Sequence, residues 1–202
     1  MEQALTHKDY GYYMKQDVFN KQGDFVTSPE ISQMFGECIG IWIITFLDKM
    51  GLISSDNSGN MQTEGFNLVE FGPGRASLMK VILNVLNQFG LLKNISLHFI
   101  EVSEFLKKIQ MENLQDFLKQ YDIYFEYSVS KDPEQKTRCE IFSNTDFNIH
   151  LHWYSTFEDY KAEIHDNKLK VNLIKDFIKK PKKNTRLEDK PVIILSNEFF
   201  DA

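Results

Sequence analysis

The chain has 202 residues, of which 42% are hydrophobic, and it carries a formal net charge of -6. This length can bury one sizeable core, so we expect a single domain. The acidic balance argues against general nucleic-acid binding, which needs a basic surface, and no apolar run reaches the ~20 residues of a membrane-spanning helix. Cys38 and Cys139 lie far apart without metal-ligand spacing, so we interpret them as reduced thiols of an intracellular compartment.

The first 26 residues are aromatic and rich in turn-forming residues, which predicts a loop with little regular structure. Met1 is followed almost at once by sequence typical of a domain, so we expect no signal or transit peptide at this start. Residues 52–66 are rich in Ser, Asn and Gly, and we predict a polar loop there as well.

Between these two loops, a helix is predicted to begin at Thr27-Ser-Pro-Glu30. The serine is a good N-cap and the proline suits the first helical position. The helix should run to about Met50, where a glycine follows. Gly36 and Gly40 lie one turn apart within it, and we interpret them as packing glycines that let another backbone come close.

The most informative stretch is Asn67–Leu78, in which an apolar strand pattern meets a Gly-x-Gly turn and then a helical pattern. Strand, glycine turn and helix open many nucleotide-binding α/β units. Glycine lets the backbone approach a ligand, and the start of the helix presents unpaired N–H groups. The turn alone is equally compatible with a tight connection that binds nothing.

The residues around the turn narrow the choice of ligand. A dinucleotide fingerprint would place a third glycine at position 77, where this chain has Ser77. Glu70-x-Gly72-x-Gly74 is instead typical of methyltransferases that use S-adenosyl-L-methionine (SAM), although these usually carry another glycine where Ala76 stands. SAM brings a positively charged amino group rather than a pyrophosphate, so a nearby carboxylate is favourable. An NAD(P)-binding oxidoreductase is therefore disfavoured.

A second strand is predicted over Ile95–Val102, followed by a helix that Ser103 is placed to cap. Glu101 lies at the end of this strand, where a carboxylate accepts both ribose hydroxyls in other nucleoside-binding α/β folds. The alternative interpretation is a solvated acid near a helix start, where negative charge is favourable in any case.

Two further strands are predicted in the second half of the chain, after residues 121–148, which indicate no clear element. Ile149–Tyr154 alternates in part, and Pro191–Leu195 is fully apolar. We interpret the basic stretch Lys161–Lys190 as a solvated insertion, because aromatic residues are not interleaved through it. Strands that alternate with helices imply right-handed crossovers and a mostly parallel sheet.

Polar residues follow the fourth strand in Asn197-Glu198-Phe-Phe-Asp201. The carboxyl ends of parallel strands line one crevice, so this loop would lie beside a methyl donor bound at the glycine turn. A carboxylate there could bind a guanidinium through paired hydrogen bonds and help to direct its lone pair. Ordinary loop and capping polarity is the alternative.

His150 and His152 lie two residues apart on the predicted third strand, with no Cys or carboxylate spacing that would complete a metal site. We interpret them as surface histidines. No Ser–His–Asp or Cys–His nucleophile arrangement is readable, and no metal is predicted.

Longer blocks of the chain resemble the MidA-like SAM-dependent methyltransferase family. The strongest runs from Gly23 to Glu37, and the others are Gly11-Tyr-Tyr13, Gly40-Ile-Trp42, Leu68–Arg75, Glu101-Val-Ser103 and Asn197–Asp201. They occur in order along nearly the whole chain. The resemblance implies an α/β, Rossmann-like SAM-dependent methyltransferase fold with SAM as donor and a protein arginine as acceptor.

The same resemblance implies roles for individual residues. Glu70, Gly72 and Gly74 would lie against the methionine part of SAM, and Glu101 would take the ribose. Thr27, Ser28, Pro29 and Glu30 would form a lid over the cofactor. Asn197, Glu198 and Asp201 would face the substrate arginine.

The family includes mitochondrial members that symmetrically dimethylate an arginine on a core subunit of complex I. The resemblance thus implies mitochondrial complex I assembly, with that subunit as protein partner and homodimer formation left open. A non-catalytic SAM-binding or assembly protein derived from the family is the alternative. Residues 1–66 would form the lid and helical segment and residues 67–202 the SAM-binding core, both within one domain.

Two departures from the family pattern carry expectations of their own. Ala76-Ser77 stands where members read Gly-Thr, and the added methyl group should weaken SAM binding. Members also continue for roughly as long again beyond Ala202. We therefore expect the fold to be truncated after its fourth strand, which would be left as an exposed apolar edge.

Overall fold

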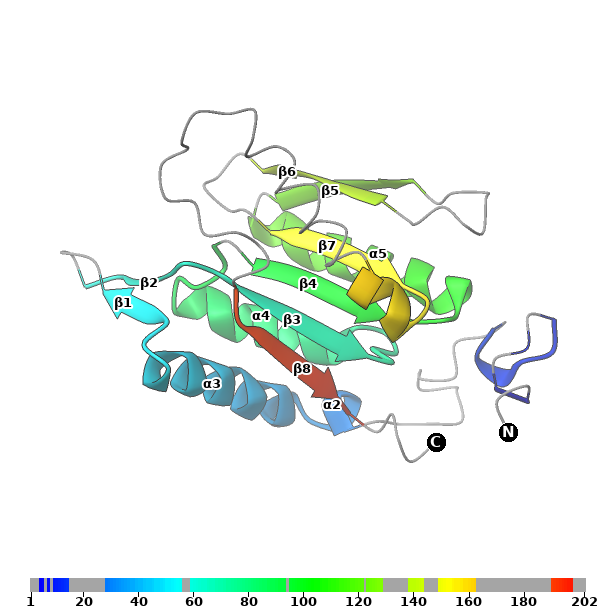
Figure 1. Cartoon of the computed structure of the whole chain (residues 1–202), viewed down its shortest axis with the longest axis horizontal. Coiled ribbons are helices and arrows are strands. Elements are labelled where there is room, and N and C mark those ends of the chain that lie inside the picture. Colours follow the sequence, from blue (N-terminus) through cyan, green and yellow to red (C-terminus); the bar gives the residue numbers. More distant parts are fainter. Residues whose placement is uncertain are drawn as a thin grey trace.

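The centre of the molecule is a four-stranded parallel sheet in the order β7-β4-β3-β8 (Figure 1). The strands are β3 (Phe66–Phe71), β4 (Ile95–Ile100), β7 (His150–Tyr154) and β8 (Val192–Ser196). The computed structural model describes residues 4, 5, 7, 9–14, 28–55, 59–93, 95–121, 123–128, 138–143, 149–162 and 190–197. The predicted α/β class and the four predicted strands are confirmed.

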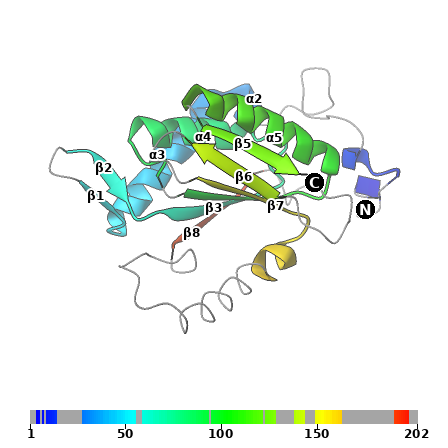
Figure 2. The same ribbon diagram turned by 90° about the horizontal axis from the view of Figure 1, so that it is seen from above.

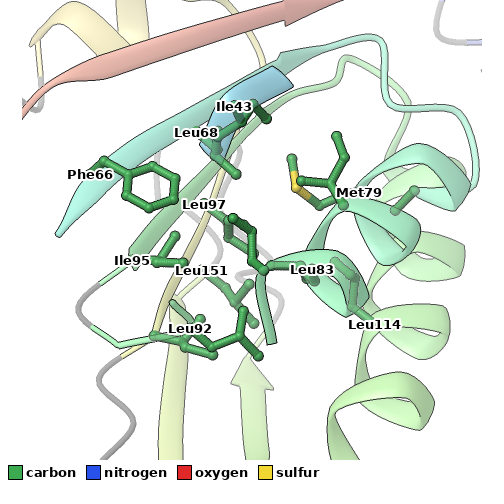
Figure 3. Close-up of a cluster of buried hydrophobic side chains, with 14 of the residues drawn as sticks. Ile43, Phe66, Leu68, Met79, Leu83, Leu92, Ile95, Leu97, Leu114 and Leu151 are labelled. Atoms are coloured by element: carbon green, nitrogen blue, oxygen red, sulfur yellow. The ribbon is translucent and has the colours of Figure 1, made fainter. Parts of the chain in front are cut away.

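Three helices cover one face of this sheet: α3 (Gln33–Lys49), α4 (Ser77–Gln88) and α5 (Glu104–Leu118). Figure 2 shows them together on one side, with a short helix over residues 157–162 on the other. α4 and α5 are the crossovers from β3 to β4 and from β4 to β7. The helix-covered face holds the main hydrophobic core, drawn in Figure 3, which includes Phe66, Leu68, Met79, Leu83, Leu97 and Leu114.

The helix predicted from Ser28 to Met50 is divided in two. α2 (Ser28–Ile31) is a single turn, and Ser32 adopts an extended conformation with φ of -147° before α3 begins. A helix does start at the predicted place, but Ser28 is the first residue of the short helix instead of its N-cap, and Ser32 is the N-cap of the long one. The extended residue explains the break, because an N-cap residue has a non-helical backbone.

Gly36 and Gly40 pack as predicted, against the neighbouring helix α4. A Cβ atom on Gly36 would lie 2.8 Å from Cβ of Val81, and one on Gly40 would lie 2.9 Å from Cβ of Val85. Both distances are too short for real atoms, so the two glycines allow α3 to approach α4 as closely as it does.

Two regions that the sequence left without structure form antiparallel hairpins. β1 (Ile53–Ser55) pairs with β2 (Met61–Thr63), so the prediction of a loop over residues 52–66 is wrong there. β5 (Ile123–Ser128) pairs with β6 (Arg138–Ser143) within the stretch that had no assignment. Short 3-10 turns, η1 (Tyr12–Met14) and η2 (Lys119–Tyr121), complete the elements named here.

Among the described strands, β8 lies at one end of the order in the four-stranded sheet. Its residues Val192 and Ile194 are 46% and 54% exposed. Of the basic stretch Lys161–Lys190, only residues 161, 162 and 190 are among those described. Among the described helices, none combines the length and the apolar character that crossing a membrane would need.

Candidate functional site at the carboxyl ends of the strands

The turn between β3 and α4 adopts a conformation that glycine favours. Gly72 and Gly74 have φ angles of 56° and 54°, and Ala76 also lies in the left-handed region with φ of 60°. The N–H of Ala76 donates to the Pro73 carbonyl at 2.7 Å, and the N–H of Gly72 donates to the Ile100 carbonyl at 3.0 Å. The second bond holds the turn beside the carboxyl end of β4. The predicted glycine turn is present, with alanine at one of its left-handed positions.

Glu70, near the end of β3, is a buried carboxylate with an unpaired oxygen. Its side chain is 3% exposed, and Oε2 has no hydrogen-bond partner within the described part of the chain. Burial raises the pKa of Glu70 to about 8, because the charged form is poorly solvated in the protein interior. Buried polar atoms are normally paired. An unpaired carboxylate oxygen beside a glycine turn is therefore a candidate contact for a cationic group.

Glu101, directly after β4, is buried as well, but its carboxylate is held on both oxygens. The N–H of Ser103 donates to Oε1 at 2.8 Å, and Nε2 of Gln110 donates to Oε2 at 3.2 Å. Burial raises the pKa of Glu101, and these two hydrogen bonds and the nearby charge of Lys107 oppose that rise. An ionised carboxylate offers about four acceptor positions. Both oxygens can therefore accept a further hydrogen bond, as two ribose hydroxyls would require.

The start of α5 brings the N-terminal part of the chain to this region. Ser103 caps the helix as predicted, because its Oγ accepts from the N–H of Leu106 at 3.3 Å. The same hydroxyl donates to the carbonyl of Tyr13 at 2.7 Å. Ser103 therefore links Tyr13 to Glu101, because its hydroxyl donates to the carbonyl of Tyr13 and its N–H donates to the carboxylate of Glu101.

Gln110 is a site residue that the sequence reasoning missed. It is completely buried and donates to the carbonyl of Gly74 at 2.9 Å as well as to Glu101. The signal available in the sequence was its position in the i+4 row with Leu106 and Leu114, where a polar side chain interrupts an otherwise apolar helix face. A pattern of this kind indicates a buried polar contact without naming its partners.

The predicted lid residues are only partly within the described structure. Ser28 and Pro29 are half-buried in α2, which packs against α4, the helix that follows the glycine turn. Thr27 and the side chain of Glu30 lie outside the described residues. The lid over the cofactor therefore stays a prediction.

The predicted substrate-facing residues follow β8. Ser196 pairs with Phe71 in parallel register, so Asn197 comes next at the sheet edge where the glycine turn begins. Asn197 is half-buried there. Glu198 and Asp201 lie outside the described residues, and their roles stay predictions.

His150 and His152 are not the surface histidines that the sequence indicated. The ring of His152 stacks on that of His98 on the neighbouring strand, with centroids 4.9 Å apart, and both predicted surface residues are partly buried. They face the side of the sheet that carries the helix over residues 157–162, where Tyr160 closes on the His98 ring at 5.1 Å. Within the described residues, no group of three His, Cys, Asp or Glu could hold a metal ion.

His98 is the buried centre of this second face. Its side chain is 2% exposed, and Nδ1 lies 3.2 Å from the hydroxyl of Tyr154. Burial, followed by the charges of His152 and His150, lowers the pKa of His98 to about 3. The ring is therefore neutral at physiological pH and belongs to the packing of the sheet.

Comparison with known proteins gives the site a context. Residues 38–202 match the model of a family of S-adenosyl-L-methionine-dependent methyltransferases. A mitochondrial protein arginine methyltransferase NDUFAF7 from Bos taurus is 38% identical over 166 residues, covering 81% of this chain and 33% of the relative. The NDUFAF7 homolog from Drosophila melanogaster is 46% identical over 112 residues, covering 55% of this chain and 23% of the relative. The chain thus spans a third or less of these relatives' lengths.

One solved structure is also similar. It is a COG1565 superfamily member from Burkholderia thailandensis, bound to S-adenosyl-homocysteine. Its sequence is 18% identical to this chain, and the TM-score is 0.46. The alignment covers 70% of this chain and 44% of the other.

Proposed function

This chain belongs to the family of SAM-dependent methyltransferases that its residues 38–202 match, and from that premise we propose that it binds SAM at the carboxyl ends of β3 and β4 for methyl transfer to a protein arginine. The observation that carries the proposal is the pair of buried carboxylates, Glu70 with an unpaired oxygen and Glu101 held in place, on either side of the glycine turn.

The chemistry of SAM fits these two groups. The cofactor carries an ammonium group on its amino-acid end, a sulfonium in the middle and a ribose diol beyond the sulfonium. The unpaired Oε2 of Glu70 would accept the ammonium and become ionised, because a buried carboxylate gains most from a directly paired cation. Glu101 would accept the two ribose hydroxyls on the positions that Ser103 and Gln110 leave free. Gly72 and Gly74 would let the backbone approach the methionine part.

When bound, SAM supplies a methyl group on a positively charged sulfur, so transfer forms an N–C bond to the acceptor as the C–S bond breaks. The chain's own residues would contribute by positioning, which supplies much of the rate in such in-line displacements. Asn197, Glu198 and Asp201 would hold the guanidinium at the end of β8, with a carboxylate accepting its proton. Thr27, Ser28, Pro29 and Glu30 would exclude water above the cofactor.

The names of the relatives extend the proposal to a cellular setting. They are mitochondrial protein arginine methyltransferases, so we place this chain's activity in mitochondria with a protein as substrate. The family resemblance adds symmetric dimethylation of a complex I core subunit during complex I assembly. Association of two copies stays a prediction.

Isothermal titration of the chain with SAM, with NAD⁺ as the control ligand, tests the binding step. We expect SAM to bind and NAD⁺ not to bind. A folded sample without affinity for SAM would overturn the proposal.

Incubation with methyl-labelled SAM and an arginine-containing complex I core subunit tests the transfer step. Label on arginine is the expected result. SAM binding without any transfer would instead support the alternative of a non-catalytic SAM-binding protein.

A further inference from the structure

Gln110 on α5 is a buried amide that connects the ends of three strands. Its Nε2 donates to the carbonyl of Gly74 at 2.9 Å and to Oε2 of Glu101 at 3.2 Å. Its Oε1 accepts from the indole N–H of Trp153 at 2.9 Å. These partners belong to the glycine turn after β3, to the residue after β4 and to β7. The side chain is 0% exposed, so protein groups, not water, define its position.

The three partners allow only one orientation of this amide. The indole N–H of Trp153 can only donate, and the carbonyl of Gly74 can only accept. An ionised Glu101 can likewise only accept. Rotating the amide by 180° would therefore set donor against donor at Trp153 and acceptor against acceptor at the other two groups. The orientation is fixed by chemistry as well as by packing.

We propose that Gln110 is a positioning residue for SAM binding, which holds the Glu101 carboxylate and the Gly74 backbone in register. This inference rests on the proposed function. Glu101 is 6% exposed, and the amide of Gln110 is the side-chain donor that the structure gives to its second oxygen. Trp153 fixes Gln110 in turn, although it lies on a strand that carries no predicted cofactor contact.

Asn113, almost one turn further along α5, offers a matched control. Its Nδ2 donates to the carbonyl of Arg75 at 3.1 Å, so it also contacts the glycine turn from the same helix. The hydrogen bond that the structure gives it reaches the turn and not Glu101. Replacing either amide by an apolar side chain of similar size removes one helix-to-turn bond, but only the change at Gln110 releases the carboxylate.

The test compares Gln110→Met with Asn113→Leu by isothermal titration with SAM and with 5′-methylthioadenosine, which has the ribose but lacks the amino-acid part. We expect Gln110→Met to weaken both ligands by the same factor, about tenfold or more, since it acts through the ribose acid. Asn113→Leu should change either affinity by less than about threefold. Midpoints of thermal unfolding, measured for both variants, separate this effect from a general loss of stability.

The pH dependence gives a reading that a merely structural role would not move. The hydrogen bond from Gln110 favours the ionised form of Glu101. Without it, the affinity for 5′-methylthioadenosine should begin to fall at a higher pH on acidification than in the wild type. An unchanged pH profile in a folded Gln110→Met variant would contradict the proposal.

Trp153→Phe keeps the proposal testable if Gln110→Met does not fold. Phenylalanine preserves an aromatic ring to stack on Phe99, whose centroid lies 5.0 Å from that of Trp153, but it removes the N–H donor. Oε1 of Gln110 then loses the donor that helps to fix the side chain, and we expect SAM affinity to fall by about threefold to tenfold. Wild-type affinity in Trp153→Phe and in any folded Gln110→Met would overturn the inference and leave the proposed function intact. Absence of SAM binding by the wild type would overturn both.

Discussion

Two buried carboxylates, Glu70 and Glu101, lie at the ends of neighbouring strands on the same side of the sheet, but they differ in their hydrogen-bond partners. Glu101 is surrounded by donors, with a backbone N–H on one oxygen and a side-chain amide on the other. Glu70 is more deeply buried, yet its Oε2 has no partner in the described part of the chain. The protein therefore supplies donors to both oxygens of Glu101, whereas Oε2 of Glu70 receives no hydrogen bond from the described residues.

The difference follows what each would bind under the proposed function. Neutral hydroxyls contribute little charge, so their acceptor must already be oriented when they arrive. A cation brings the charge that a buried carboxylate lacks, so its partner can remain protonated until the ligand enters. The ribose side is therefore pre-organised, whereas the methionine side is poised to change its protonation.

The largest effect on SAM affinity should come from Glu101, the carboxylate that has donors on both oxygens. Glu101→Ala removes the acceptor of both ribose hydroxyls and leaves two buried donors unpaired. We expect SAM affinity to fall by about 100-fold or more, and affinity for 5′-methylthioadenosine to fall equally. Glu112→Ala, at an exposed acid on α5, is the control measured beside it by titration calorimetry. A loss within the range of that control would remove Glu101 from the site.

A change at Glu70 should affect SAM and 5′-methylthioadenosine differently. Glu70→Gln removes the charge that would pair with the ammonium of SAM while keeping the shape of the side chain. At pH 8 we expect SAM affinity to fall by about 10- to 30-fold and affinity for 5′-methylthioadenosine to stay within about twofold. Parallel titrations of both ligands measure this difference. If the two affinities fell together, Glu70 would act on the whole site and the contrast with Glu101 would disappear.

The raised pKa of Glu70 should make the ligand-free protein less stable as pH rises. We call this decrease in the free energy of unfolding the alkaline limb. The pKa of Glu70 is about 8 in the folded state and 4.5 without the effect of burial, as in the unfolded chain. The folded state therefore binds more protons between these two pH values. The free energy of unfolding should therefore decrease as pH rises from 4.5 to 8, by up to about 1.4 kcal/mol per unit. The opposite contribution of His98 ends at pH 6.5, so denaturant unfolding between pH 6.5 and 8 should show the alkaline limb in the wild type but not in Glu70→Gln.

His98 on the opposite face of the sheet provides a limb of the other sign. Its pKa is lowered from 6.5 to about 3, so the unfolded state binds more protons between these values. The contribution of His98 to stability should be complete above pH 6.5 and be lost on acidification by up to about 1.4 kcal/mol per unit, with no opposing contribution from Glu70 below pH 4.5. A His98→Phe variant should lose this acid limb in the same unfolding series and keep the alkaline one. Loss of both limbs in one variant would show that the two faces are not independent.

The smallest effect is expected at the glycine turn between β3 and α4. Ala76→Gly relieves a left-handed alanine, worth about 1–2 kcal/mol. It also gives up a buried methyl group and makes the unfolded chain more flexible, which together offset about the same amount. We expect nearly unchanged unfolding but an increase in SAM affinity of about two- to fivefold, because the backbone can approach more closely. Weaker binding by the glycine variant would show that the methyl group assists the site.

Local pattern was sufficient for the four strands of the parallel sheet, for the long helices and for the positions of both carboxylates. Glu70 could be placed because it lies inside an apolar run that ends at a glycine turn, and Glu101 because it follows an apolar run that ends at a capped helix. Gly36 and Gly40 were interpreted correctly because helical spacing puts them on one face. The hairpin β1–β2 was missed because three-residue strands are too short to establish an alternating pattern.

The contacts that complete the site depend on tertiary structure. Gln110 joins residues 36, 9 and 43 positions away in the sequence, a combination that no local pattern contains. His152 looked like a surface residue because part of its packing comes from His98 on the neighbouring strand β4, which is distant in the sequence.

The most direct test of the account is proton release when SAM binds. At pH 7 a Glu70 with pKa about 8 is ~90% protonated in the ligand-free protein, and pairing with the ammonium of SAM should ionise it. Calorimetry in phosphate and in Tris, which differ in ionisation enthalpy, should therefore report nearly one proton released per SAM in the wild type and none in Glu70→Gln. Binding enthalpies that are equal in the two buffers for the wild type would contradict the account.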